Sequence, residues 1–381
     1  MSEAKQVSRI INGEIFDGEG FTTRDLGVSE RLFGAAGEGE VVDASGCYVI
    51  PGLVDIHFHG SAGGDMSDGD LQGLHAMGRY EASRGVTCMC PATMTLSEAQ
   101  LMEAAKTARE YVPAPDEADL VGINMEGPFI SPSKVGAQNP DYVRNATIDE
   151  FKRLQDASGG LFKLVDIAPE EPGAEDFIEE FGDKVRISVA HTCTDYETAA
   201  KAFDAGASHI THLYNAMDPM HHRKPGPIPA GAERDHVMAE IIADGIHIHP
   251  AMVRLAFNMF GDDRMVLVSD TLRAAGMGDG VYDLGGQDVT VKGYEARIEN
   301  GALAGSVSDL MRCLYVAVKD MDIPLKSAVK AASTNPARAI GIDGEYGSLE
   351  DGKVADAILL DKDTLEVKGV ILRGKLLAAT A

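Results

Sequence analysis

Residues 51–60 read PGLVDIHFHG, a short β-branched run that ends in two histidines separated by one residue. A run of this kind predicts a buried strand. On a strand, side chains two positions apart point to the same face, so His57 and His59 would present both imidazoles to one ligand. Two imidazoles on one face are rarely needed for packing, and the pair therefore indicates a metal site at the end of this strand.

Seven further runs of the same kind follow along the chain, separated by amphipathic or Ala-rich segments. Helices are expected at residues 70–84, 97–110, 147–157, 195–204 and 250–260. Alternating strands and helices predict a parallel α/β fold, and eight such units match the usual size of a (β/α)₈ TIM barrel. A doubly wound open sheet is the alternative, but no Gly-rich phosphate-binding fingerprint follows the first strand. The expected strands lie at residues 53–60, 85–95, 120–129, 162–170, 184–192, 207–217, 237–249 and 265–271.

The two flanks have a different pattern, with short alternating strands separated by Gly, Asn and Asp turns. Neither flank is long enough to fold alone, so residues 1–50 and 346–381 are expected to pair into one small β-sandwich beside the barrel at 51–345. A Gly-rich stretch at about 276–302 predicts an inserted hairpin after the eighth strand.

Composition narrows the class of protein. The chain has 381 residues, of which 44% are hydrophobic and 25% charged, as in an ordinary globular protein. Acidic residues outnumber basic ones 60 to 34, giving a formal net charge of −26, which disfavours nucleic acid and anionic membranes as partners. No signal peptide or membrane-spanning stretch is recognised, and five cysteines without a disulfide spacing suit a reducing cytoplasm.

Residues able to bind metal or transfer protons follow five of the expected strands. In a barrel, active sites lie at the carboxyl ends of the strands, so these side chains should converge on one rim. Four imidazoles and two carboxylates form a nitrogen and oxygen site suited to Zn²⁺, Fe²⁺ or a similar divalent ion. The residues are His57, His59, Glu126, His191, His212 and Asp270.

Several motifs occur in a fixed order along nearly the whole chain. They are PGLVDIHFHG, NMEGPF at 124–129, SVAHT at 188–192, ITHLYNAM at 210–217, HHRKPG at 221–226, IIADGIHIH at 241–249 and VSDTLRAAG at 268–276. In this order they resemble N-acetylglucosamine-6-phosphate deacetylases of the amidohydrolase superfamily. The resemblance implies metal-dependent hydrolysis of the acetamide of an amino-sugar phosphate to the free amine and acetate.

The resemblance also implies roles for individual residues. Glu126, His191 and His212 would hold the principal metal ion, and His57 with His59 would make a second site that shares Glu126. One or two ions of Zn or Fe per subunit are expected. Asp270 would act first as base toward water and then as acid toward the departing amine.

Substrate contacts are implied for a further set of residues. The side chain of Asn215, the backbone of Ala216 and the side chains of Arg223, His247 and Gln138 are expected to bind the sugar phosphate. Arg223 would reach the site of a neighbouring subunit, so a homodimer is expected. The basic run at 221–224 would also attract an anionic substrate to an otherwise acidic chain.

Two positions depart from the usual pattern and leave the substrate open. Gln138 stands in GAQNP where many relatives have His, and Asp309 adds a carboxylate in a region that usually contacts substrate through an apolar residue. Asp309 is expected either to point inward or to face solvent at a helix N-terminus capped by Ser306 or Ser308. The alternatives are an amidohydrolase acting on a related N-acyl substrate, such as N-acetylgalactosamine 6-phosphate, or a non-catalytic scaffold barrel, which would typically have lost its metal ligands.

Overall fold

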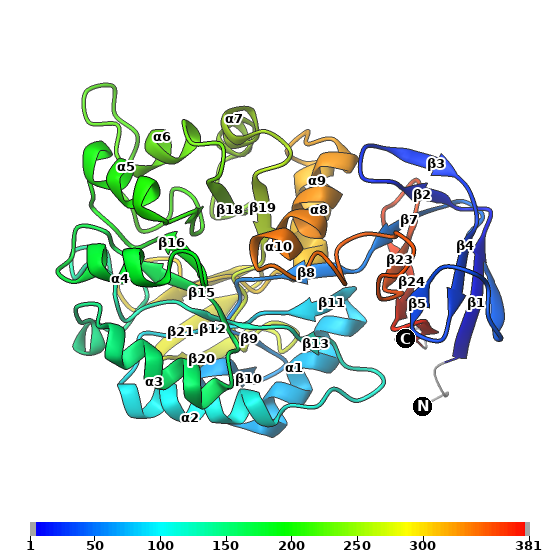
Figure 1. Cartoon of the computed structure of the whole chain (residues 1–381), viewed down its shortest axis with the longest axis horizontal. Helices are drawn as coiled ribbons and strands as arrows, with labels where there is room; N and C mark the ends of the chain where they lie inside the picture. Colours follow the sequence, from blue (N-terminus) through cyan, green and yellow to red (C-terminus); the bar gives the residue numbers. More distant parts are fainter. Residues whose placement is uncertain (1–4, 378–381) are drawn as a thin grey trace.

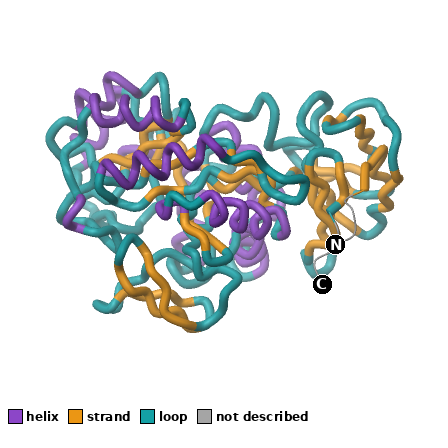
Figure 2. The backbone as a smooth tube through the Cα atoms, turned by 90° about the horizontal axis from the view of Figure 1, so that it is seen from below, coloured by secondary structure: helices purple, strands orange, loops and turns teal. Residues whose placement is uncertain are grey.

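The computed structural model of the chain describes residues 5–377. Parallel strands form a curved sheet that helices cover, and a separate mixed sheet lies at one end of the molecule (Figure 1). Figure 2 shows that end as strands and loops, with the helices gathered over the rest of the molecule. Within residues 5–377, no helix combines the length and apolarity needed to cross a bilayer.

The parallel strands are buried on both faces because helices and their neighbours cover them, which explains the nearly continuous apolar runs in the sequence. They form a seven-stranded sheet in the order β12-β14-β15-β16-β17-β18-β19 and a three-stranded sheet in the order β13-β11-β8. The strands are β8 (Leu53–Asp55), β11 (Val86–Met89), β12 (Ala92–Thr93), β13 (Asp119–Leu120), β14 (Ile123–Met125), β15 (Phe162–Ile167), β16 (Arg186–Val189), β17 (His209–Ile210), β18 (Met238–Ile242) and β19 (Met265–Val268).

The two parallel sheets are connected in two ways: the chain runs directly from β11 in one sheet to β12 in the other, and backbone hydrogen bonds join the segments after β8 and β19. β11 and β12 follow one another along one expected run, and β11 pairs with β8 while β12 pairs with β14. Beyond the strand ends, the amide of Asp270 donates to the carbonyl oxygen of His57 at 2.9 Å. The amide of His59 donates to the carbonyl oxygen of Thr271 at 2.7 Å. The segment after β19 therefore lies beside the segment after β8.

The helices begin at recognisable caps. Asp70 accepts from backbone amides at the start of α1, and Ser97 and Gln100 form a capping box at the start of α2. The five helices expected from the sequence are present. The helices are α1 (Leu71–Ser83), α2 (Glu98–Glu110), α3 (Ile148–Ser158), α4 (Ala174–Phe181), α5 (Tyr196–Ala205), α6 (Pro227–Ala232), α7 (Pro250–Phe260), α8 (Leu310–Lys319), α9 (Leu325–Ala332) and α10 (Thr334–Ala339), with short 3₁₀ turns η1 (Met66–Asp68) and η2 (Pro140–Tyr142).

Asp309 lies at a helix N-terminus, as expected, but the expected cap, Ser306 or Ser308, was wrong. Asp309 is itself the N-cap of α8: its carboxylate accepts from the amide of Arg312 at 2.8 Å and lies 3.6 Å from Arg84 Nε. Ser306 instead donates to the carbonyl oxygen of Ser269 at 2.6 Å. A carboxylate caps a helix as well as a hydroxyl does. Asp309 directly precedes the first helical residue, so it caps α8 in place of either serine.

Both ends of the described chain join in the mixed sheet. Its order is β3-β2-β7-β23-β24-β25-β1-β4-β5, with β6 on β1, and Leu359 pairs with Val49 across the junction of the two ends. An apolar cluster including Val7, Ile10 and Ile371 forms its core. The strands are β1 (Lys5–Ile11), β2 (Glu14–Phe16), β3 (Phe21–Thr23), β4 (Leu26–Ser29), β5 (Leu32–Phe33), β6 (Glu40–Asp43), β7 (Cys47–Pro51), β23 (Ala357–Asp361), β24 (Val367–Leu372) and β25 (Lys375–Leu376).

The insertion after the last parallel strand is an antiparallel sheet of three strands. These are β20 (Gly280–Leu284), β21 (Gln287–Lys292) and β22 (Glu295–Ile298). A short pair, β9 (Gly60–Ser61) and β10 (Gly64–Asp65), follows the two histidines of the first run. The inserted sheet contacts the loop before η2, because Gln287 Nε2 donates to the carbonyl oxygen of Ala137 at 2.6 Å.

Candidate metal centre

Six side chains meet at the carboxyl ends of the parallel strands. All six are buried, and each lies within four residues of the end of its strand. They come from the segments after β8, β14, β16, β17 and β19, so the fold brings together residues that are far apart in the sequence. They are His57, His59, Glu126, His191, His212 and Asp270, the set expected from the sequence.

The Glu126 carboxylate lies at the middle of this cluster. Its Oε1 atom is 3.1 Å from His191 Nε2 and 3.0 Å from His212 Nε2, and these two nitrogens are 3.1 Å apart. One carboxylate oxygen and two imidazole nitrogens therefore face a common point.

A second group of side chains shares the same carboxylate. His57 Nε2 lies 3.4 Å from Glu126 Oε1, and His59 Nε2 lies 3.2 Å from Glu126 Oε2. Asp270 Oδ1 is 3.4 Å from His59 Nε2 and 3.9 Å from His57 Nε2. The ligand atoms of His57, Glu126 and His212, and those of His57, His59 and Asp270, each lie within 4.8 Å of one another.

The backbone adopts a sparsely populated conformation at three of these residues. The φ angles of His191, His212 and Asp270 are +43°, +26° and +50°, in the left-handed region that favours glycine. Strain of this kind gathers at functional sites and persists only where the surroundings hold it. Here backbone bonds on either side hold it, including that from the amide of Asp270 to His57.

Opposite charges in the cluster shift each other's ionisation. Burial acts to raise the pKa of both carboxyls, but the neighbouring imidazoles outweigh it: the pKa of Glu126 falls well below its usual value, and that of Asp270 is also lowered. Burial acts to lower the pKa of His59, but Asp270 and Glu126 raise it to about 10. Asp270 is therefore an ionised carboxylate at neutral pH.

The donor set fits a divalent cation. His191 Nδ1 lies 2.8 Å from the carbonyl oxygen of Lys134, which accepts only, so Nδ1 carries the proton and a neutral ring leaves the Nε2 lone pair toward Glu126. His57 has the same arrangement, with Nδ1 2.8 Å from Glu240 Oε2. Lone pairs of imidazoles and carboxylate oxygens facing one another require a cation between them, either protons or a metal ion. Nitrogen and oxygen donors of this kind suit Zn²⁺ or Fe²⁺.

Gln138 contacts the cluster directly. Its Nε2 donates to Glu126 Oε2, and its Oε1 accepts from the amide of Thr95 at 2.6 Å. The Thr95 bond fixes which end of the side-chain amide is the oxygen. Both ends are therefore engaged within the protein.

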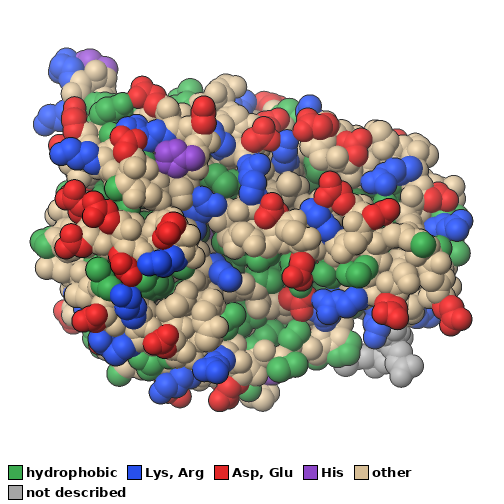
Figure 3. Space-filling model, in the orientation of Figure 1, with side chains coloured by type: hydrophobic (Ala, Val, Ile, Leu, Met, Phe, Trp, Pro, Cys, Tyr) green, Lys and Arg blue, Asp and Glu red, His purple; other side chains and the backbone are tan. Residues whose placement is uncertain are grey.

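Of the other expected substrate residues, some lie beside the cluster and one lies on an exposed loop. Asn215 and Ala216 follow His212, and Asn215 Nδ2 donates to the carbonyl oxygen of His212 at 3.1 Å. Arg223 is exposed, and within residues 5–377 its guanidinium hydrogen-bonds to its neighbour His222, at 2.6 Å. The loop before α6, which carries Arg223, stands away from the body in Figure 1, and Figure 3 shows Lys, Arg and His side chains at that corner. The structure of one chain therefore does not bring Arg223 to its own cluster.

His247 is held by an acidic neighbour. Its Nδ1 lies 2.8 Å from Asp244 Oδ2, and Asp244 Oδ1 accepts from the backbone amides of Ile246 and His247. Burial acts to lower the pKa of His247, but Asp244, with a contribution from Asp270, raises it above the usual value. The protonated form of this buried imidazole is therefore favoured relative to that of a free histidine, which suits a position close to an anionic group.

Two buried acids beneath the cluster were not identified from the sequence. Glu240, within β18, contacts both His57 and His209, and Asp55, at the end of β8, accepts from the hydroxyl of Ser269 at 2.5 Å. Burial acts to raise the pKa of Glu240, but His57 and His209 lower it to about 2. The signal for Glu240 in the sequence was its position as a single acidic residue inside an otherwise apolar strand, MAEII.

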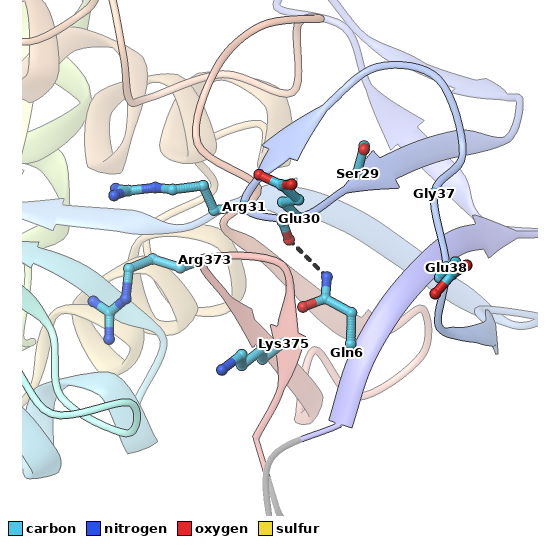
Figure 4. A pocket seen from close by; sticks show the side chains of 8 residues that line it. All are labelled: Gln6, Ser29, Glu30, Arg31, Gly37, Glu38, Arg373 and Lys375. Atoms are coloured by element: carbon cyan, nitrogen blue, oxygen red, sulfur yellow. Dashed lines mark hydrogen bonds between the residues drawn. The ribbon is translucent and has the colours of Figure 1, made fainter.

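One hollow in the surface lies on the mixed sheet and not at the cluster. This hollow has a volume of about 660 Å³. Figure 4 shows its lining side chains, among which Gln6 donates to the carbonyl oxygen of Glu30. Its basic residues include Arg373, whose guanidinium is already held by Asp119 at 2.8 Å. It combines acidic and basic side chains and lacks the convergent histidines, so the strand-end cluster is the better candidate site. The lining residues are Gln6, Ser29, Glu30, Arg31, Gly37, Glu38, Arg373 and Lys375.

Comparison with known proteins gives matches over nearly the whole chain. The N-acetylglucosamine-6-phosphate deacetylase of Bacillus subtilis (strain 168) is 38% identical over 333 residues, which are 86% of this chain and 84% of that protein. The N-acetylgalactosamine-6-phosphate deacetylase of Escherichia coli O157:H7 is 34% identical over 330 residues, 86% of this chain and 87% of that protein.

A solved structure is similar in both sequence and fold. It is a mutant N-acetyl-D-glucosamine-6-phosphate deacetylase from Mycobacterium smegmatis in complex with N-acetyl-D-glucosamine-6-phosphate. It is 31% identical, covers 97% of this chain and 98% of that chain, and has a TM-score of 0.88. The amidohydrolase family matches residues 48–377. As the motifs predicted, the chain belongs to the amidohydrolase family.

Proposed function

We propose that this protein hydrolyses the acetamide of N-acetylglucosamine 6-phosphate to glucosamine 6-phosphate and acetate. The observation that carries the proposal is the cluster itself: four imidazoles and Glu126 converge beside an ionised Asp270 at the strand ends. The similarity to deacetylases that act on amino-sugar phosphates supports this substrate class.

Glu126, His191 and His212 would hold the principal metal ion, and His57 and His59 would hold a second one that shares Glu126. The ion is Zn or Fe, with one or two per subunit, because the donors are nitrogen and oxygen atoms. When bound, a divalent cation polarises the acetamide carbonyl and lowers the pKa of water.

Asp270 moves the proton. Its Oδ1 faces His59 and His57, so its carboxylate accepts a proton from a water molecule on that side of the cluster. As the new carbon–oxygen bond forms and the carbon–nitrogen bond breaks, Asp270 returns the proton to the sugar nitrogen. An amine leaves readily only when protonated, so the same carboxylate serves both steps.

The sugar phosphate is bound by the residues around the cluster. Asn215 and the backbone of Ala216 follow His212 closely in the chain, and the buried His247 contributes a ring nitrogen. Arg223 binds the phosphate of a neighbouring subunit's substrate, which explains why its loop stands away from its own cluster and makes the active form a homodimer. Gln138 binds substrate through the second N–H of its side-chain amide, while the first donates to Glu126 and its oxygen accepts from Thr95. We place the enzyme in the cytoplasm.

The same proposal includes the domain organisation. Residues 51–345 would form one (β/α)₈ barrel, in support of which backbone hydrogen bonds of His57 and His59 join the segment after β8 to the segment after β19. The flanks before residue 51 and after residue 345 would form a β-sandwich, in support of which their described parts, residues 5–50 and 346–377, give the mixed sheet and its apolar core.

The second candidate substrate is the galactosamine epimer. The 34% identity to an N-acetylgalactosamine-6-phosphate deacetylase favours it. A scaffold role has no such support, because every expected ligand is present in the cluster.

The test is acetate release by the purified protein with its metals counted. N-acetylglucosamine 6-phosphate, its galactosamine epimer and the unphosphorylated sugar are compared at equal concentrations. We expect metal-dependent turnover highest on the phosphorylated glucosamine substrate. Preference for the epimer would move the assignment to the second candidate, and metal binding without turnover on any of the three would overturn the substrate class.

A further inference from the structure

Glu240 lies in the middle of β18 and is fully buried. It is the only charged residue of that strand, whose other members are apolar. Burying a carboxylate is costly unless hydrogen bonds and opposite charges compensate. The contacts that compensate Glu240 show what it does.

All of these contacts lead to the segments that carry the cluster. Glu240 Oε2 lies 2.8 Å from His57 Nδ1 and accepts from the backbone amide of His212 at 3.2 Å. Glu240 Oε1 lies 3.2 Å from His209 Nε2. One carboxylate therefore joins the segment after β8 to β17 and the segment that follows it.

The bond to His57 determines which ring nitrogen faces the cluster. An ionised carboxylate only accepts, so His57 Nδ1 carries the proton. In the neutral ring the Nε2 lone pair then points to Glu126 Oε1, 3.4 Å away. Within residues 5–377, His57 Nε2 has no hydrogen-bond partner, although it is buried. A buried imidazole nitrogen with a free lone pair directed at a carboxylate is the arrangement expected of a metal ligand.

The bond to His212 acts on the backbone. His212 has a φ of +26°, a conformation that persists only where its surroundings hold it. The same Oε2 atom that orients His57 accepts from this strained residue's amide. A single oxygen thus contacts one residue from each of the two groups of ligands around Glu126.

We propose that Glu240 is a positioning residue of the metal centre, which sets the tautomer of His57 and holds the backbone of His212 so that both present Nε2 to the cation. The inference rests on the metal site of the proposed function and adds to it a residue that touches neither substrate nor metal. Partners of ligating histidines typically change metal affinity 10- to 100-fold when they are replaced.

The test compares Glu240→Gln with the matched variant Glu117→Gln. Glu117 is also buried and lies 2.7 Å from a histidine, His75 Nδ1, but that histidine is outside the cluster. The measurements are Zn²⁺ affinity by chelator competition, metal content after dialysis, and the Tm of the metal-free protein. We expect Glu240→Gln to weaken Zn²⁺ binding at least 10-fold and Glu117→Gln to leave it unchanged, while the metal-free Tm falls similarly in both.

The outcomes of these measurements distinguish a positioning role of Glu240 from a purely structural one. Equal Zn²⁺ affinity in wild type and Glu240→Gln would overturn the positioning role and leave Glu240 as a structural acid. If Glu240→Gln does not fold, Glu240→Asp keeps the charge but shortens its reach, and it too must weaken Zn²⁺ binding. The effect of Glu240→Gln must also shrink in a His57→Gln background, because the two act through one bond. Wild type that binds Zn²⁺ yet has no deacetylase activity would contradict the proposed substrate while leaving this inference testable.

Discussion

The backbone amide of Asp270 donates to the carbonyl oxygen of His57 over 2.9 Å. The proposed proton carrier and the first proposed metal ligand are thus fixed to each other by main chain, independently of their side chains. Their side chains also lie near each other, with 3.9 Å between Asp270 Oδ1 and His57 Nε2.

Asp270→Asn should therefore remove catalysis without removing the site. The amide side chain has nearly the same shape but accepts no proton, and general acid–base catalysis typically contributes 10²- to 10⁴-fold. We expect kcat for acetate release to fall by at least about 10²-fold with the metal content retained. Loss of metal together with activity would show that Asp270 acts as a ligand rather than as the proton carrier.

Arg223→Ala should raise KM for the phosphorylated sugar by roughly 10-fold with little change in kcat, because it removes binding that is equal in ground and transition states. Turnover of the unphosphorylated sugar should not change. Lys224→Ala is the matched control, since it removes the same charge one residue away. Equal effects of the two variants would mean that the loop acts only through its net charge.

Gln138→Leu should reduce both stability and metal affinity. It leaves the buried amide of Thr95 without its acceptor, at a cost of about 1–3 kcal/mol, and removes the donor to Glu126. Urea unfolding and Zn²⁺ affinity measure the two effects. Gln287→Leu is the control, because Gln287 holds the same loop at Ala137 without contacting Glu126. If it reproduces the whole loss of affinity, the order of the loop and not the contact of Gln138 is responsible.

Asp356 gives a prediction for the mixed sheet that does not depend on the metal. Burial raises the pKa of Asp356 from 3.8 to about 7, while the Arg373 amide, at 2.6 Å, partly offsets the shift. Folding thus favours the protonated acid: its contribution to stability is complete below the unfolded pKa and is lost as the pH rises through about 7.

Asp356→Asn should accordingly be more stable than wild type at high pH. The difference in free energy of unfolding should grow between about pH 4 and 7 and then level off, at no more than about 4 kcal/mol. Urea unfolding across this range measures it, with the exposed Asp363→Asn as control. A difference that does not depend on pH would mean that Asp356 keeps an ordinary pKa in the folded protein.

The sequence predicted the parallel strands because each is an apolar run buried on both faces, and it predicted the cluster because the ligands lie at strand ends. The strands expected from the sequence were longer than those in the structure in some cases. The run at 207–217 is a strand only at His209–Ile210, since His212, Tyr214 and Ala216 all have positive φ. A propensity for extended structure does not reveal such strain, which the surrounding hydrogen bonds impose.

Glu240 could not be recognised in the same way. It lies within a strand and not at its end, and its partners are 28 to 183 residues away in the chain. Only the packing of three neighbouring segments gives it a role.

The pairing of β7 with β23 has a consequence for biosynthesis. The strands near the amino end leave the ribosome first, yet their partners at residues 357–376 are made about 300 residues later. At roughly 5–20 residues per second, this interval is tens of seconds. During it, β7 exposes an edge that can pair with other nascent chains, so a chaperone that shields this edge should raise the yield of native enzyme.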